Sequence, residues 1–394
     1  MRVPYHLTII VLFLTVLGCS SPEAKQKRIE KDRAEKDSVS LVYDSTKANK
    51  EIDAFMQKLH KKSAFNGNVL IAKKGKIIYQ NTFGWADYLH KDSLKITSKF
   101  ELASVSKPLT SLGVLKLIED GKLQYTQTVN DFFPDFPYPG VTIDMLLSHR
   151  SGLPNYVYFS EDKWPDRSKA MSNMDAMNLL IEFKPARYGS PGGRYHYNNS
   201  NFMVLASIIE KITGSDFGVY MKETIFDPAG MKNTAVLSKA VYETIPTDVV
   251  GHDKVWRRSV VQNYLDGPVG DKGIYSTVQD LFLLDAALKD ERIVKKSTLD
   301  SAYVPRTDSK NSTFGYGYGW RTFSPKDAQV VYHTGWWHGF RNLYVRDLTH
   351  DVTIVLLSNM ANGSLLRLDE LYEILEIPVL RKSAYNANGD FVVN

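Results

Sequence analysis

Apolar residues near the two ends of the chain follow the patterns of β-strands. Residues 65–72 and 76–80 each contain an apolar stretch and are separated by the tight turn Lys74-Gly75, which predicts a β-hairpin. Further along the chain, apolar runs alternate with short turns, as in an antiparallel meander. Its three strands are predicted at residues 330–333, 342–346 and 352–357.

Longer apolar segments predict helices. Residues 109–118 are apolar on nearly every side, and Gly121 ends the run. A helix that is apolar all round is buried, so we expect this one to run through the centre of the domain. Gly214 and Thr277 are typical of a helix C-terminus and an N-cap, and Asp280 after Thr277 resembles a capping box. Other helices are predicted at residues 51–61, 202–212, 277–289 and 365–375.

The order of these elements favours an α+β fold. We expect one antiparallel sheet flanked by helices and built from both ends of the domain, from residues of about 51–120 and 265–380. A turn-rich, all-helical part of about residues 121–264 is inserted between them. The boundary between the two parts is a natural place for a cleft. The domain as a whole is predicted at residues 51–380, followed by a tail at 381–394.

Composition narrows the class of protein. The chain has 394 residues, of which 43% are hydrophobic and 24% are charged, as in a globular protein. The net charge of +5 is small, and no basic stripe is interleaved with aromatic residues, so nucleic acid is not an expected partner. The nine histidines are scattered along the chain, so neither a metal site nor a cofactor is expected.

The N-terminus has the pattern of an export signal. Arg2 precedes an apolar run at residues 7–17, which is too short to span a bilayer but suits a signal peptide at residues 1–18. Val16-Leu17-Gly18-Cys19 resembles a bacterial lipobox, in which the cysteine becomes the lipidated first residue of the mature protein. The alternative is an ordinary signal peptide followed by an incidental cysteine.

The segment after Cys19 is predicted to be a tether. Residues 19–50 are rich in charge and poor in aromatic residues, so they cannot bury a core of their own. Ser20 supplies no acidic retention signal for the inner membrane, so we expect an outer-membrane lipoprotein that faces the periplasm or the cell surface. Because Cys19 is the only cysteine, no disulfide is expected within the chain.

The first candidate for chemistry is the pair Ser104 and Lys107. Residues three apart on a helix share a face, so the amine can reach the hydroxyl. A serine becomes nucleophilic when a base takes its proton, and burial at the start of an apolar helix lowers the pKa of lysine toward neutrality. The alternative is a helix cap beside a surface lysine. A second copy of the pattern, Ser160 and Lys163, stands in a polar segment and is interpreted as a solvated loop.

Two further motifs carry suitable side chains. Tyr197 and Asn199 precede the helix predicted at residues 202–212. A tyrosine hydroxyl with a lowered pKa can shuttle protons, and the amide of Asn199 can bind a substrate amide or hold Lys107. The alternative for Tyr197 is simple packing at the edge of a loop.

His333-Thr334-Gly335 ends a predicted strand. The glycine allows a ligand to approach the strand closely, and the other two residues supply donors for a substrate carboxylate or carbonyl. The alternative is a strand end with a solvent-facing histidine.

In this order the motifs resemble those of the serine β-lactamase and penicillin-binding protein superfamily. Tyr197-Asn198-Asn199 is similar to the second motif of the branch that contains class C β-lactamases, DD-peptidases and esterases. Other segments resemble that branch across residues 51–380: Phe83-Gly84-Trp85-Ala86, residues 146–154 (LLSHRSGLP), Pro228-Ala229-Gly230-Met231, residues 273–277 with Asp280, and Leu356-Leu357-Ser358-Asn359.

The resemblance implies a β-lactamase/transpeptidase-like fold and a role for each residue. Ser104 is the acylated nucleophile, Lys107 its base and Tyr197 the proton shuttle. The backbone N–H groups of Ser104 and Trp336 form the oxyanion hole.

The residue His333 departs from the class C pattern, which has lysine at this position. A largely neutral histidine is a poor partner for the carboxylate of a β-lactam. Arg341 is a candidate replacement for that contact.

The expected function is that of an exported serine hydrolase with DD-peptidase-like or esterase-like activity on D-amino-acid peptides or small esters. Its partners are then a small-molecule or cell-wall peptide substrate and, through the lipid on Cys19, a membrane; a monomer is expected. Two alternatives remain open: a β-lactamase proper, and a non-hydrolytic protein of the same fold that binds penicillin or senses the cell wall.

Overall fold

The computed structural model describes residues 50–237, 249–254, 257–307 and 313–381. The predicted signal peptide, Cys19, almost all of the tether and all but the first residue of the tail lie outside the described residues. Within the described ranges, no helix has both the length and the apolar character needed to cross a membrane.

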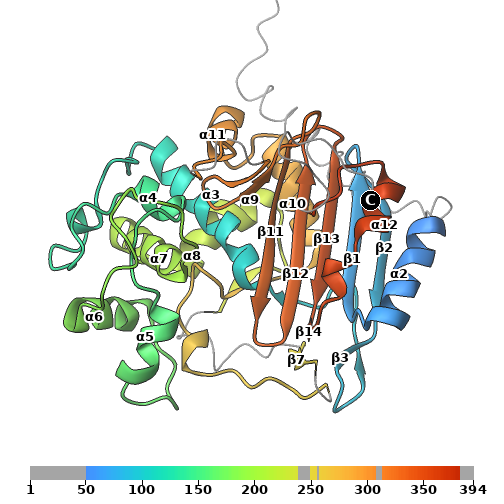
Figure 1. The fold of residues 1–394 in the computed structure, drawn as a ribbon, viewed down its shortest axis with the longest axis horizontal. Coiled ribbons are helices and arrows are strands. Elements are labelled where there is room, and N and C mark those ends of the chain that lie inside the picture. The colour runs from blue at the N-terminus through green and yellow to red at the C-terminus, as the bar shows by residue number, and fades with distance from the viewer. Residues whose placement is uncertain (1–49, 238–248, 255–256, 308–312, 382–394) are drawn as a thin grey trace, which may run out of the picture. The chain divides into compact units, whose positions relative to one another are not determined.

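A seven-stranded antiparallel sheet forms the centre of the structure (Figure 1). Its first hairpin pairs with a strand from near the other end of the domain, so that Val69 lies opposite Leu356. Both ends of the domain therefore build one sheet, as predicted. In spatial order its strands are β2 (Lys76–Phe83), β1 (Gly67–Lys73), β13 (Val352–Ser358), β12 (Phe340–Asp347), β11 (Val330–Trp337), β10 (Arg321–Phe323) and β9 (Phe314–Tyr316).

Both faces of the central strands are buried. Val69 and Ile71 of β1 pack into one hydrophobic core, whereas Leu70 and Ala72 pack into another. Successive residues of a strand point to opposite faces, so an apolar run rather than a strict alternation is what this position requires. The first core lies beneath α2 (Lys50–Ser63) and α12 (Asp369–Leu375), which cover one face of the sheet (Figure 1).

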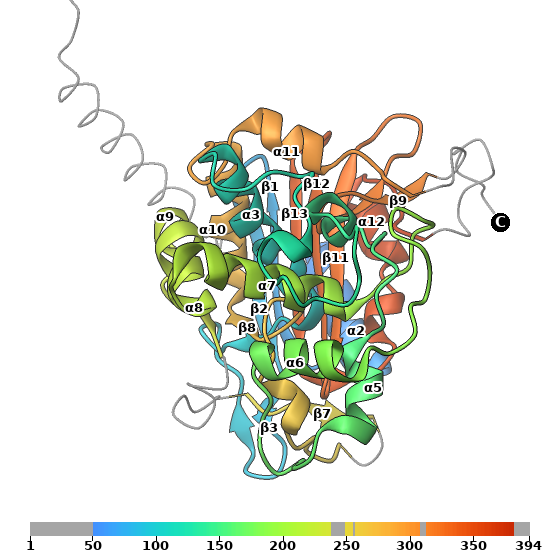
Figure 2. The ribbon, with the colours of Figure 1, turned by 90° about the vertical axis from the view of Figure 1, so that its left-hand side faces the viewer.

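The other face of the sheet carries the remaining helices and the larger core (Figure 2). α10 (Val278–Lys289) packs against β1 and β13, and α3 (Ser106–Glu119) packs against α7 (Asn199–Thr213). Further helices of this side are α4 (Ile143–Leu147), α5 (Tyr156–Lys163), α6 (Asn173–Phe183), α8 (Phe217–Met221), α9 (Asp227–Ala229) and α11 (Lys296–Ala302).

Short elements complete the description. A small three-stranded sheet is formed by β5 (Phe100–Glu101), β8 (Ile274–Ser276) and β6 (Ala235–Val236). Two pairs of short strands are β3 (Trp85–Asp87) with β4 (Asp92–Ser93), and β14 (Met360–Ala361) with β7 (His252–Asp253). The single turns are η2 (Ala103–Val105), η3 (Val129–Asp131), the π-turn η4 (Lys222–Phe226), η5 (Tyr264–Asp266) and η6 (Ser364–Leu366).

The predicted α+β fold is confirmed, with local corrections. The N-cap at Thr277 is present, but the carboxylate of Asp280 accepts from Asn233 N and Thr234 Oγ1, both at 2.7 Å, so no capping box forms. The last helix begins at Asp369 rather than near residue 365, because Arg367 has the non-helical dihedrals φ −122° and ψ 50°.

The helix α3 carries Lys107 in its first turn, and Ser104 lies in the turn directly before the helix. Eleven of its fourteen residues are buried, as its all-round apolar pattern predicts. Its first turn therefore lies inside the protein, and a lysine in that turn must be buried with it. The hydroxyl of Ser111 and the hydroxyl of Thr110 donate to the carbonyls of Tyr318 and Gly270, which fixes the helix against both neighbouring segments.

Candidate active site

Ser104 and Lys107 lie together at the start of α3. Ser104 is in the turn η2, directly before the helix, and Lys107 is fully buried one turn later. Lys107 Nζ lies 2.9 Å from Ser104 Oγ. The structure therefore places the amine where a base for this serine has to be, and Lys107 is not the surface residue of the alternative interpretation.

The hydrogen-bond partners of Lys107 define what its amine can do. Besides Ser104, Nζ contacts Asn199 Oδ1 and the main-chain oxygen of Asp271, both at 2.8 Å. Both oxygens are pure acceptors, and a neutral amine has two N–H groups and one lone pair. When the two N–H groups are donated to these oxygens, the lone pair is left for the hydroxyl proton of Ser104.

Burial also favours the neutral amine. Desolvation, assisted by the nearby cation of Arg321 and opposed by the charge of Asp271, lowers the pKa of Lys107 to about 7. At neutral pH a large fraction of the amine is thus unprotonated. A lysine in this state is a suitable general base, since its pKa lies near the pH at which it has to work.

Tyr197 adjoins both groups. Its hydroxyl is hydrogen-bonded to Ser104, and Lys107 Nζ lies 5.0 Å from the centroid of its ring. The expectation of a lowered pKa for Tyr197 is wrong, because burial raises the pKa of this phenol above its ordinary value. In the free protein Tyr197 is protonated, and its hydroxyl can donate to Ser104 Oγ while Ser104 donates to Lys107.

The backbone before Ser104 is strained. Ala103 has a φ of +52°, a left-handed conformation that alanine rarely adopts. It is held there by Glu101, whose Oε1 accepts from the N–H groups of Ala103 at 3.1 Å and Gly273 at 2.8 Å. Burial raises the pKa of Glu101 to about 7.

Gly335 lets β11 approach this strained turn. A Cβ on Gly335 would lie 2.3 Å from the main-chain oxygen of Leu102, so any side chain would push β11 and η2 apart. The glycine of the third motif thus permits the close approach of two backbone segments, and Thr334, Gly335 and Trp336 all line the cleft beside Ser104.

The structure places His333 differently both from the expected substrate-binding role and from the alternative of a solvent-facing side chain. Its side chain is fully buried, and its Nδ1 lies 2.8 Å from Thr334 O. Its Nε2 lies 3.2 Å from Tyr316 Oη. Both ring nitrogens are engaged within the protein, so neither is free for a substrate carboxylate.

The contacts of a second histidine, His149, determine which ring nitrogen of each histidine carries the proton. Asn198 N–H donates to His149 Nδ1 at 3.2 Å, so neutral His149 carries its proton on Nε2 and donates it to Tyr316 Oη at 3.2 Å. Tyr316 then donates to His333 Nε2. Burial, with nearby cations, holds the pKa of both histidines well below the usual range, so His333 brings no positive charge to the site.

Positive charge in the cleft comes from two arginines. The cleft has a volume of about 540 Å³, and none of the described residues that line it is acidic. Arg321 lies 5.3 Å from the ring centroid of Tyr197, and Arg341 lies 4.2 Å from that of Trp336. The Nε atoms of both arginines are buried without a hydrogen-bond partner. The described lining of the cleft therefore carries positive charge and no negative charge.

Sequence reasoning identified Arg341 but missed Arg321 and the carbonyl of Asp271. Arg321 follows an aromatic, glycine-rich turn, and no spacing in the sequence links it to Ser104. It reaches the cleft because β10 pairs with β11, with Arg321 opposite Tyr332. A main-chain oxygen carries no side-chain signal at all, so the role of Asp271 depends on the path of the backbone.

The second serine–lysine pair is placed differently from the prediction. Ser160 and Lys163 belong to the helix α5, which Asn155 caps, rather than to a solvated loop. Ser160 is buried, whereas Lys163 lies 5.1 Å from the ring centroid of Phe183. The amine and the hydroxyl point to different surroundings, and the pair does not repeat the geometry at Ser104.

Comparison with known proteins identifies the family. A model of the Beta-lactamase family matches residues 49–377. The chain belongs to this family, within the superfamily of serine hydrolases that includes β-lactamases and penicillin-binding proteins. It is a serine hydrolase of the β-lactamase type.

Individual relatives support the same family, and a solved structure supports the fold. Penicillin-binding protein 4* of Bacillus subtilis is 36% identical over 324 residues, which are 79% of this chain and 71% of that protein. A D-aminopeptidase of Cereibacter sphaeroides is 26% identical over 300 residues, which are 73% of this chain and 55% of that protein. The crystal structure of a penicillin-binding protein from Bacillus halodurans has a TM-score of 0.71 at 24% identity and covers 82% of this chain and 98% of that one.

The pKa of Lys107 leads to the first prediction. The rate of acylation of Ser104 by a neutral ester is expected to rise with pH through about 7, because the amine becomes a base as it loses its proton. The variant Lys107→Arg keeps its proton throughout and is expected to lose about 10³-fold or more in rate. Stopped-flow kinetics from pH 5 to 9 would check both. A flat profile in the wild type, or near-normal acylation of Lys107→Arg, would contradict the assignment.

Proposed function

We propose that this protein hydrolyses small acyl substrates through a covalent intermediate on Ser104. The observation that carries the proposal is the set of contacts of Lys107 Nζ, which lies 2.8 Å from two carbonyl oxygens and 2.9 Å from Ser104 Oγ. When the neutral amine donates its two N–H groups to the carbonyls, its lone pair is left for the proton of Ser104. A pure binding protein has no need for a buried lysine held in this way.

The proposed reaction has two steps. Ser104 Oγ attacks the substrate carbonyl as its proton moves to Lys107, and the bond to the leaving group breaks when that group receives a proton. Tyr197 lies beside both residues and donates this proton, while Lys107 returns one to Tyr197. A water molecule then attacks the acyl carbon by the reverse relay and frees Ser104.

The developing oxyanion is proposed to bind the N–H groups of Ser104 and Trp336. Support comes from Gly335, which brings β11 against the turn that contains Ser104. The left-handed Ala103, held by Glu101, sets the direction of the N–H that follows it. Donors that are fixed before the reaction contribute most to stabilisation of an oxyanion.

We propose carboxylate-bearing peptides of D-amino acids, or related small esters, as the substrates. The two arginines of the cleft, and the absence of acidic side chains among the described residues that line it, favour an anionic substrate. The exposed rings of Tyr158 and Trp336 at its rim favour an apolar group beside the scissile bond. A D-aminopeptidase among the relatives is consistent with this class.

Location is a separate proposal that depends on residues 1–20. We propose that Cys19 is lipidated after export, which would anchor the enzyme in the outer membrane beside cell-wall substrates. Cells labelled with an alkyne fatty acid are expected to label the full-length wild type but not Cys19→Ser. Equal labelling of the two proteins would exclude this cysteine as the anchor.

The nucleophile can be tested by intact-mass spectrometry. A fluorophosphonate probe is expected to add one equivalent to the wild type, and no adduct should form on Ser104→Ala. The matched control is Ser160→Ala, the serine of the second Ser-x-x-Lys pattern, which should react normally. A panel of D-amino-acid peptides, esters and β-lactams then separates turnover from stable acylation. No adduct on the wild type, or an adduct that persists on Ser104→Ala, would refute the proposal.

The anion site can be tested by comparing paired substrates. For Arg321→Gln, we expect kcat/KM to fall about 10- to 100-fold more for a substrate with a free carboxylate than for its methyl ester, since one charge-assisted contact is lost. The ratio cancels any effect on Lys107. Arg258→Gln is a matched control, because Arg258 is exposed and pairs with Asp253. An unchanged ratio in Arg321→Gln would exclude Arg321 as the carboxylate ligand.

A further inference from the structure

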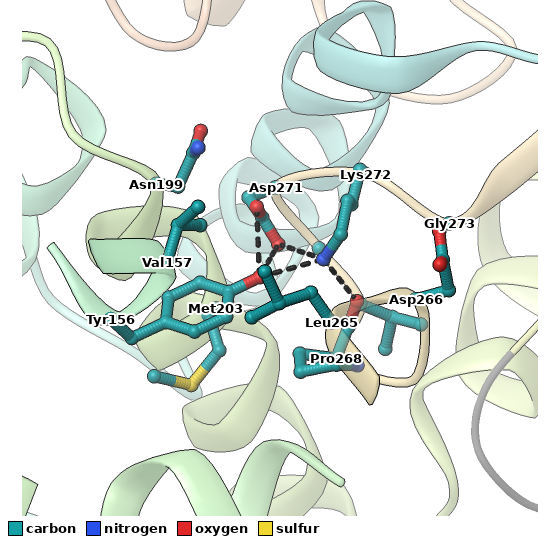
Figure 3. Close-up of polar contacts among 12 residues, drawn as sticks. Tyr156, Val157, Asn199, Met203, Leu265, Asp266, Pro268, Asp271, Lys272 and Gly273 are labelled. Atoms are coloured by element: carbon teal, nitrogen blue, oxygen red, sulfur yellow. Dashed lines mark hydrogen bonds and ion pairs between the residues drawn. The ribbon is translucent and has the colours of Figure 1, made fainter. Parts of the chain in front are cut away.

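A buried group of polar and charged residues, Tyr156, Asp271 and Lys272, contacts Lys107 through the main-chain oxygen of Asp271. Figure 3 shows the polar contacts within this group. Tyr156, the first residue of α5, Asp271 and Lys272 are each at most 3% exposed. The two charged residues occupy a turn between Gly270 and Gly273, whose φ values of +101° and +88° suit glycine. None of these three residues belongs to a motif that marks the site in the sequence.

The hydrogen bonds within the group run in one direction. Lys272 Nζ donates to Tyr156 Oη at 2.7 Å, and Tyr156 donates to the carboxylate of Asp271, with distances of 3.2 and 3.1 Å to its two oxygens. Lys272 also donates to Pro268 O at 2.9 Å and lies 3.6 Å from Asp271 Oδ1. The carboxylate is thus held by both a hydroxyl and an ammonium group.

Asp271, whose carboxylate is held in this way, also contacts Lys107 through its main-chain oxygen. The main-chain oxygen of Asp271 accepts from Lys107 Nζ at 2.8 Å. The turn is further fixed by Thr110, whose hydroxyl donates to Gly270 O at 2.7 Å. The side chain of Asp271 also acts at a distance, since its charge favours the protonated form of Lys107 and so raises the pKa of that amine.

We propose that Asp271 and Lys272, with Tyr156, are positioning residues that set both the orientation and the proton affinity of Lys107. Asp271 orients the amine through its carbonyl and attracts its proton through its carboxylate, and Lys272 balances that attraction. This inference rests on the proposed function, in which Lys107 is the base. It adds that the opposite charges of Asp271 and Lys272 together determine the pH at which Lys107 loses its proton.

Other charged or titratable groups also face Lys107. Arg321 across the cleft opposes its protonation, whereas His149, His333 and Tyr197 are neutral near pH 7 because burial shifts the pKa of each away from neutrality.

Glu101, Asp266 and Trp337 also belong to the surroundings of the charge pair, and Lys272 Nζ lies 5.1 Å from the ring centroid of Trp337. Burial raises the pKa of Glu101, and the charge of Lys272 opposes that rise. The indole of Trp337 donates to Asp266 at 2.6 Å. The variants at Asp271 and Lys272 described next keep all of these surrounding groups. A change in the titration of Lys107 in those variants therefore reports on Asp271 and Lys272.

The test measures the pKa of Lys107 in single variants of the pair. In Asp271→Asn the attraction for the proton is lost, and the midpoint should move to lower pH by about half a unit or more. In Lys272→Met the carboxylate is no longer balanced, and the midpoint should move to higher pH by a similar amount. Opposite shifts are a result that a merely structural role does not produce. Shifts in the same direction, or none in folded variants, would overturn the inference.

Two further variants keep the test decisive. The double variant Asp271→Asn/Lys272→Met carries no buried unpaired charge; its midpoint should lie between those of the single variants, and its acylation rate should fall through looser orientation of the amine. Asp285→Asn is a matched control, since Asp285 and Arg346 form another buried pair with a 2.6 Å contact outside the cleft. It should lower stability and leave the midpoint of Lys107 unchanged.

Two readouts separate this inference from the proposed function. NMR of protein labelled at the lysine ε-carbon follows the protonation of Lys107 directly, with its resonance assigned by its loss in Lys107→Met. The pH dependence of fluorophosphonate acylation follows the same group through chemistry. If the NMR midpoints move in opposite directions but Ser104 is never acylated, the pair tunes the lysine and the proposed function fails. If Ser104 is acylated normally and the midpoints do not move, only the inference fails.

Discussion

The site depends on one constraint: the amine of Lys107 is buried with two carbonyl acceptors and one hydroxyl around it. Burial makes the charged amine costly, by about 5 kcal/mol for a pKa that falls from 10.5 to about 7. The carbonyls of Asn199 and Asp271 each take one N–H of the neutral amine. What is left is a lone pair directed at Ser104, which is the property a general base requires.

Several distant parts of the fold meet to satisfy this constraint. The all-round apolar pattern of α3 buries its first turn, α7 brings Asn199, and the turn before β8 brings the carbonyl of Asp271. β11 approaches the turn η2 closely because Gly335 has no side chain. The charges near the lysine lie in two places: the buried pair of Asp271 and Lys272, and the two arginines that line the cleft.

The sequence predicted the sheet, the buried helix and the family, because each depends on patterns of apolar residues or on short motifs. It also predicted the contact of Lys107 with Ser104 and, as one of two options, with Asn199. The place of His333 could not be predicted, since its burial depends on Tyr316 and His149 from other parts of the chain. Arg321 and the carbonyl of Asp271 became visible only when strand pairing and the backbone path were known.

The central claim concerns hydrogen positions, so neutron diffraction tests it most directly. In a crystal of the free enzyme exchanged into heavy water at a pD well above the pKa of Lys107, we predict two deuterons on Nζ. One should point to Asn199 Oδ1 and one to the main-chain oxygen of Asp271, with the deuteron of Ser104 Oγ directed at Nζ. Three deuterons on Nζ, or a Ser104 deuteron directed away from it, would contradict the account.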